Sequence, residues 1–184
     1  MFNDPIEAWH DAFCSIRSRT GNGSSGITWD VIQGELAKVK HTVLALPSKQ
    51  LDIGMVMFAP DDAQGNYLSR VEQFIYRCLL DLKPERSNSL KQIRRLSMLV
   101  DALIIRCRRE MNDHDSKITD VEIAASLGIF PSAYNRDYQS DANFVMEQLK
   151  CYAGDALVEV SITCNKIKKG YYQSDNQSVR MDNK

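Results

Sequence analysis

The spacing of apolar residues is the feature that most constrains how this chain folds. Between residues 66 and 82, Leu68, Val71, Ile75 and Cys78 follow one another at intervals of three or four. This spacing places the four side chains on one stripe of an α-helix. Almost every periodic segment of the chain has the same period. The sequence therefore predicts an all-α protein, a multi-helix bundle.

The N-terminal half contains several expected helices. Asp4 followed by Pro5 is typical of a helix start, because aspartate caps the first turn and proline is tolerated at its first position. Thr28 is expected to cap a second helix, which Pro47 ends. The stretch 48–58 suits either a short buried strand or a short helix. We expect a helix there, because its neighbours are helical.

Two long helices are expected in the C-terminal half. One runs from about Leu90 to Met111, and the residues expected to face inward are Ile93, Val100, Ile104 and Cys107. The other covers roughly Asp141 to Lys168, and the polar residues after it are expected to fray. Three regions follow: a helical N-terminal region at 1–87 for dimerisation or partner contacts, a helix-turn-helix region at 88–168, and a flexible polar tail at 169–184.

Composition narrows the class of protein. The 184 residues are 43% hydrophobic and 26% charged, which is ordinary for a globular protein. No apolar run approaches the roughly 18 residues of a membrane span, and no signal peptide is visible, so we expect a cytoplasmic protein without membrane contacts. The formal net charge of −1 argues against indiscriminate coating of nucleic acid, but it leaves room for a local basic face.

Cofactor and catalytic patterns are missing from the sequence. The cysteines are scattered along the chain and odd in number, which indicates reduced thiols rather than a disulfide framework. His10 precedes Asp11, but neither a His-x-x-x-His nor a Cys-x-x-Cys pattern occurs, so we expect no metal site. No spacing suggests a nucleophile with a base or a phosphate-binding loop. We therefore expect a protein without enzymatic activity or cofactor.

The stretch 118–138, ITDVEIAASLGIFPSAYNRDY, contains signals for two short helices. Thr119 and Glu122 have the spacing of a capping box, in which each side chain binds a backbone N–H at the helix start. Gly128 permits the left-handed turn that ends one helix and redirects the chain. Pro131 then begins a second helix. Tyr134 and Tyr138, four positions apart, are expected to face the core.

This stretch resembles the helix-turn-helix of DNA-binding regulators, whose common run is Ile-Ala-x-x-Leu-Gly-Ile-x-Pro-Ser-x-Val-x-Arg-Asp-Leu. The corresponding residues here are Ile123, Ala124, Leu127, Gly128, Ile129, Pro131, Ser132, Tyr134, Arg136, Asp137 and Tyr138. The chain departs from the pattern at Phe130, where a capping serine or threonine is usual, and at the two tyrosines, which replace aliphatic residues. The resemblance covers a small part of the chain and implies a module only.

The resemblance implies that the second helix enters the major groove of double-stranded DNA. Asn135 would then pair with adenine, Arg136 with guanine or phosphate, and Ser132 would hold a phosphate. Basic residues nearby, among them Arg108, would contact the backbone. The candidate DNA-binding residues are Ser132, Ala133, Asn135, Arg136, Gln139, Lys117, Arg106 and Arg109.

The functional expectation is a sequence-specific transcription regulator of phage or mobile-element origin. Its layout suits an antiterminator that contacts RNA polymerase, and the N-terminal region would support a homodimer. A replication-origin binder shares the same DNA chemistry. The alternative from another class is a helical adaptor or inhibitor protein that acts through protein contacts, because two packed helices of this kind also occur in proteins that never bind DNA. A positive surface around residues 106–139 favours DNA, and an apolar face at Phe130 favours a protein partner.

Overall fold

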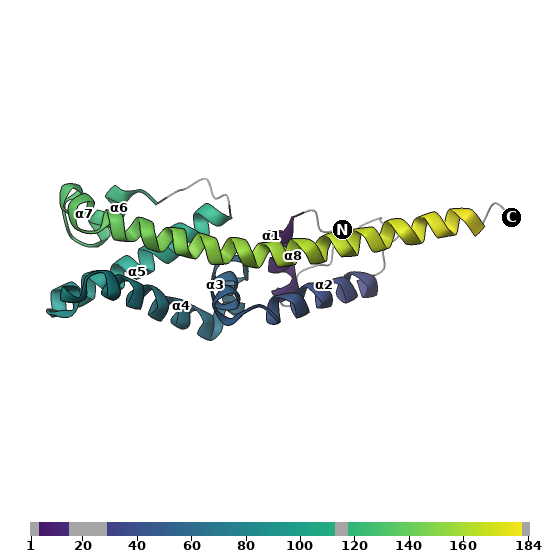
Figure 1. The fold of residues 1–184 in the computed structure, drawn as a ribbon, viewed down its shortest axis with the longest axis horizontal. Helices are drawn as coiled ribbons and strands as arrows, with labels where there is room; N and C mark the ends of the chain where they lie inside the picture. Colours follow the sequence, from purple (N-terminus) through teal and green to yellow (C-terminus); the bar gives the residue numbers. More distant parts are fainter. Residues whose placement is uncertain (1–3, 15–28, 113–117, 182–184) are drawn as a thin grey trace.

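The computed structural model describes residues 4–14, 29–112 and 118–181. Every regular element in these ranges is helical, so the all-α prediction is confirmed (Figure 1). In chain order the elements are α1 (Pro5–Phe13), α2 (Trp29–Leu44), α3 (Ser48–Phe58), α4 (Asp61–Leu82), the 3-10 turn η2 (Pro84–Ser87), α5 (Leu90–Met111), α6 (Asp120–Ser126), α7 (Pro131–Asp137) and α8 (Gln139–Met181).

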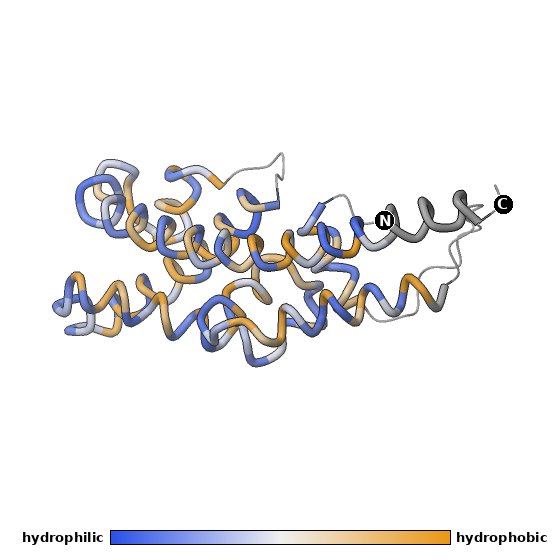
Figure 2. The backbone as a smooth tube through the Cα atoms, turned by 45° about the vertical axis from the view of Figure 1, so that its right-hand side comes forward, coloured by the Kyte–Doolittle hydropathy of each residue, from blue (hydrophilic) through white to orange (hydrophobic). Residues whose placement is uncertain are grey.

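Helix α8 organises the molecule. It runs along the long axis, with α6 and α7 at its start and α2 beside its later part (Figure 1). It packs against α1, α2, α3, α4, α5 and α7. The residues it buries recur at helical spacing, and they include Val145, Leu149, Ala156, Val160 and Ile167. Figure 2 shows hydrophobic and hydrophilic segments alternating along the other helices, as expected when each helix has one buried face.

Helices α1 and α3 pack closely against each other in the core. Trp9 is fully buried, and its ring centroid lies 5.4 Å from that of Phe58. A Cβ atom added to Gly54 would lie 2.3 Å from Cη2 of Trp9. No side chain fits in that space, so a glycine is required at position 54 for the indole to pack directly on the α3 backbone.

Several expected element boundaries are confirmed, and others are wrong. The stretch 48–58 is helix α3, and the segment from Leu90 to Met111 is helix α5. Helix α8, however, continues to Met181, so the chain is helical well past the expected end near Lys168. The expected cap Thr28 lies outside the described residues. None of the described helices is long and apolar enough to cross a membrane.

One residue of the expected inward stripe on α5 points elsewhere. Ile93 is 36% exposed, whereas Leu96, Leu99 and Leu103 are buried together with Val100, Ile104 and Cys107. Helix α5 carries apolar residues on more than one face, and its own periodicity does not decide which of them contact α4 and α8. Tertiary packing selects the face.

Candidate nucleic-acid interface

Helix α6 starts at the expected capping box. The Thr119 hydroxyl accepts a hydrogen bond from the Glu122 amide at 3.3 Å, and the Thr119 amide donates to the Glu122 carboxylate at 2.7 Å. The bond from the Thr119 amide, and a second from the Thr119 hydroxyl at 2.9 Å, favour the charged carboxylate, so the pKa of Glu122 is lowered. The capping-box prediction is confirmed.

The turn between α6 and α7 has the hydrogen bonds of a Schellman motif. Gly128 has a φ of +63°, and its amide donates to the carbonyl of Ala125 at 3.0 Å. The next amide, of Ile129, donates to the carbonyl of Ala124 at 3.1 Å. This pair of bonds satisfies carbonyls at the end of α6 and turns the chain sharply toward α7. The left-handed glycine expected at position 128 is confirmed.

Helix α7 is fixed to the body by its inner face. Tyr134 is fully buried, as expected, and Tyr138 is half-buried. Their rings stack with centroids 6.3 Å apart and an interplanar angle of 12°. Burial of the phenol, with a smaller contribution from Asp120, raises the pKa of Tyr134 to about 12. The two tyrosines therefore replace the usual aliphatic core as a stacked pair.

A buried ionic cluster holds the junction of α7 and α8. The guanidinium of Arg86, a residue only 5% exposed, donates to the carboxylate of Asp141 and, at 2.6 Å, to the carbonyl of Asp137. Lys83 donates to the same carbonyl at 3.0 Å and pairs with Asp141 at 2.9 Å. Arg86 also lies 4.7 Å from the centre of the Tyr138 ring. No local pattern predicts this cluster, because Arg86 and Asp141 are far apart in the chain.

The outward face of α7 carries three of the expected DNA-binding residues. Ser132, Asn135 and Arg136 are exposed there, whereas Ala133 is half-buried. The Arg136 side chain is 75% exposed, and its guanidinium donates two hydrogen bonds of 2.8 Å to its neighbour Asp137. The structure therefore groups these side chains on one surface, with the arginine charge already paired.

Two other candidates have partners inside the protein. Arg106 donates to Glu110 at 2.9 Å and to Asp120 at 2.6 Å. Gln139 donates to the second carboxylate oxygen of Asp120 at 2.8 Å. This network joins α5, α6 and α8 to one another. It occupies Arg106 and Gln139 in positioning the two short helices.

The other basic candidates are Arg108, Arg109 and Lys117. Arg108 pairs with Asp61 at 2.6 Å and donates to the carbonyl of Ala59 at 3.1 Å. Arg109 is half-buried, and its charge contributes to the lowered pKa of Glu122. Lys117 lies outside the described residues. Arg106 and Arg108, two of the basic side chains at the end of α5, are thus paired with carboxylates inside the protein.

An apolar side chain stands beside the polar residues of α7. Phe130, directly before the helix, is 82% exposed, and Val121 on α6 is 60% exposed. Phe130 makes no side-chain capping bond to α7. The surface that the two short helices present combines an exposed aromatic ring with hydrogen-bonding groups, the exposed carboxylate of Glu122 and one paired arginine.

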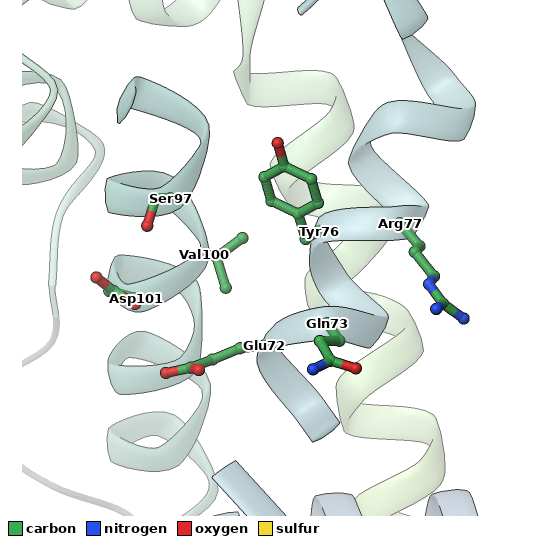
Figure 3. A pocket seen from close by; sticks show the side chains of 7 residues that line it. All are labelled: Glu72, Gln73, Tyr76, Arg77, Ser97, Val100 and Asp101. Carbon is green, nitrogen blue, oxygen red and sulfur yellow. The ribbon is translucent and has the colours of Figure 1, made fainter. Parts of the chain in front are cut away.

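A second surface feature lies between α4 and α5. It is a groove of about 530 Å³ lined by Glu72, Gln73, Tyr76, Arg77, Ser97, Val100 and Asp101. In Figure 3 the Glu72 carboxylate extends toward α5, whereas Arg77 points away from the groove. The described residues here do not bring together the three or more histidine, cysteine or acidic ligands of a metal site.

Comparisons with known proteins add no relative to this description. No protein-family model, curated protein or solved structure matches the chain.

Proposed function

We propose that this protein binds double-stranded DNA through α7, as a sequence-specific transcription regulator. The observation that carries the proposal is the way α7 is presented. A Schellman turn fixes its start, the Arg86–Asp141 cluster fixes its end, and Ser132, Asn135 and Arg136 point outward between them. A helix that reads base edges needs such a rigid mounting and an exposed polar face.

The exposed side chains have suitable chemistry for base recognition. The Asn135 amide matches the donor and acceptor that adenine presents in the major groove, and the Arg136 guanidinium matches the two acceptors of guanine. Arg136 must exchange its pairing with Asp137 for a contact with DNA. Because the pair is exposed to solvent, this exchange is inexpensive.

The regulatory role is the finer part of the proposal. Mild acidity and a compact module late in the chain suit a regulator of phage or mobile-element type, including an antiterminator that also contacts RNA polymerase. The remaining helices offer surface for such a contact or for a homodimer.

A protein-binding adaptor is the second candidate, and a specific observation favours it. Phe130 and Val121 are exposed close to α7, and Arg106 and Arg108 are paired with carboxylates. An exposed aromatic ring is typical of a protein contact, where aromatic residues supply much of the binding energy.

Selection of sequences from a genomic DNA library tests the proposal. The intact protein is expected to enrich a recurring site, and Asn135→Ala and Arg136→Ala are each expected to erase its preference. Arg70→Ala is the matched control, because Arg70 is also an exposed arginine paired with an aspartate, Asp52, but lies on α4. This variant should retain the same site.

The salt dependence of binding completes the test. Binding through phosphates should weaken steeply as salt rises, and the slope should change little in Asn135→Ala, which removes a base contact only. If the protein enriches no sequence and retains no DNA at low salt, the DNA proposal fails. The adaptor is then the remaining candidate, and Phe130→Ala becomes the variant with which to examine protein partners.

A further inference from the structure

We propose that the C-terminal end of α1 is a binding site for a divalent transition-metal ion of the zinc class, held by His10, Asp11 and Cys14. This proposal is independent of DNA binding. It differs from the prediction of no metal site, which rests on the absence of the His-x-x-x-His and Cys-x-x-Cys patterns. His10 and Cys14 are four positions apart, so they form a His-x-x-x-Cys pair on one helical turn.

The three ligand atoms already lie close together. Nδ1 of His10 is 3.3 Å from Sγ of Cys14 and 4.0 Å from Oδ1 of Asp11. The three atoms all lie within 4.8 Å of one another. Metal–ligand bonds of 2.0–2.3 Å in a tetrahedron place neighbouring ligand atoms ~3.5 Å apart, so small side-chain rotations are enough to close the site.

The helix explains this proximity. Successive residues are rotated by about 100°, so Cys14, one turn further along, lies angularly between His10 and Asp11. The three positions form a triangle on one face of α1. The Cys14 amide donates to the carbonyl of His10 at 3.0 Å, which fixes the backbone across this triangle.

Helix α1, which carries the three proposed ligands, is held rigidly. Trp9, adjacent to His10, is fully buried against Gly54 and Phe58. At the other end of α1, the Asp4 carboxylate accepts a hydrogen bond from the amide of Ile6 at 2.9 Å. Ligands mounted on such a fixed element lose little freedom on binding a metal.

The ligand chemistry balances the charge of the ion. A neutral imidazole, a carboxylate and a thiolate together carry two negative charges, and their mixed nitrogen, oxygen and sulfur atoms suit Zn²⁺ with a water as the fourth ligand. Binding converts the Cys14 thiol into a thiolate and releases its proton to the solvent. Arg108 and Arg109 line the same cavity as His10, and the charge of Arg108 is offset by Asp61.

Titration of the full chain with Co²⁺, under reducing and oxygen-free conditions, tests the site. A thiolate-to-cobalt charge-transfer band is expected in the near ultraviolet, together with visible bands of a four-coordinate ion, and Zn²⁺ should displace both. Cys14→Ser is expected to abolish the charge-transfer band. His10→Ala and Asp11→Asn should each weaken Co²⁺ binding by more than about 10-fold. A loss of about 10-fold is expected when the residue removed only supports a metal ligand, so a larger loss indicates a ligand itself.

Cys151→Ser is the matched control, because Cys151 is an exposed cysteine on α8. It should bind Co²⁺ as the unmodified protein does. Zn²⁺ should raise the unfolding temperature of the unmodified protein and of Cys151→Ser, but not that of Cys14→Ser. An unchanged charge-transfer band in Cys14→Ser, an equal loss in Cys151→Ser, or no binding at micromolar Co²⁺ would each overturn the proposal.

Discussion

The contact around Trp9 and the mounting of α7 hold their helices in different ways. Trp9 is fixed by apolar packing against Gly54 and Phe58, where a single added carbon has no space. Helix α7 is fixed by a backbone turn, by the stacked Tyr134 and Tyr138 rings and by the cluster around Arg86. The side chains that make the contact around Trp9 are buried. The mounting of α7 keeps one side of this helix exposed.

This difference shows how a small helix stays rigid while presenting a surface. A contact that is buried on all sides gains stability from its area, but the side chains that form it are not accessible to a ligand. Helix α7 has one inner face, and directional bonds at both ends compensate for the packing it lacks. The predictions that follow challenge this contrast, from the largest expected effect to the smallest.

Replacement of Trp9 tests the packing side of the comparison. Trp9→Ala is expected to lower the free energy of unfolding by about 3–5 kcal/mol, because it leaves a large cavity between α1 and α3. Chemical denaturation measures the change. Phe130→Ala is the matched control, since Phe130 is an aromatic residue that is 82% exposed. Its cost should stay within about 0.5 kcal/mol. Equal costs for the two variants would contradict the contrast.

Removal of Arg86 tests the polar side. Arg86→Ala is expected to cost about 1–3 kcal/mol, because Asp141 and the carbonyl of Asp137 lose a buried partner and keep only Lys83. Hydrogen exchange should show lost protection in α7 and at the start of α8, with α3 little affected. Arg70→Ala removes an exposed arginine–aspartate pair and should leave protection unchanged. A loss spread evenly over the molecule would show that the cluster does not act locally.

Substitutions at Gly54 and Gly128 distinguish a lack of space for a side chain from an unfavourable backbone conformation. Gly54→Ala should cost about 1–3 kcal/mol because its Cβ would overlap the Trp9 ring. Gly128→Ala should cost about 1–2 kcal/mol, because an alanine is strained at a φ of +63° although the space around it is open. Gly34→Ala, in an open position on α2, should stabilise the protein by about 0.5–1 kcal/mol. Thermal or chemical unfolding distinguishes the three, and a stabilising Gly128→Ala would contradict the assigned turn.

The smallest effect at neutral pH is expected for Tyr134→Phe. The Tyr134 hydroxyl has no hydrogen-bond partner among the described residues, so its removal should change stability little near pH 7. At alkaline pH the variant should differ. The pKa of Tyr134 is raised to about 12 in the folded protein, above the ordinary value near 10. The stability that depends on the neutral phenol is therefore fully present below pH 10 and is lost as the pH rises toward 12.

Unfolding curves measured between pH 8 and about pH 12 give the comparison. The Tyr134→Phe variant should lose less stability over this range than the unmodified protein. Burial also raises the pKa of the Cys107 thiol to about 12, so some alkaline loss should remain in the variant. Identical alkaline losses in the two proteins would show that Tyr134 is not held in its neutral form.

Local signals in the sequence predict much of the module around α6 and α7. The capping box, the left-handed Gly128 and Pro131 at the start of α7 each depend on residues within one or two turns. Such features follow from backbone geometry alone. The stretch 48–58 differs, because its local pattern suits either a strand or a helix and the helix is expected only because its neighbours are helical.

Local sequence patterns do not predict the contacts between distant segments. Arg86 meets Asp141, and Arg106 meets Asp120, only after the helices have packed. The sequence therefore predicts the basic residues around α7 but not that carboxylates pair with several of them. The prediction for Ile93 is wrong for a similar reason, because α5 has more than one apolar face and packing on α4 and α8 determines which is buried. His10 and Cys14 are four positions apart, so the sequence alone places them on one helical turn.

The central position of α8 has a consequence for how the protein is made. A ribosome produces the chain from its N-terminus, so α1 to α7 emerge before the helix against which most of them pack. Until then the apolar faces with which α2 and α3 pack on α8 have no partner. During synthesis, hydrophobic surface on these helices therefore stays uncovered until α8 has emerged. The folding of α8 onto them buries this surface.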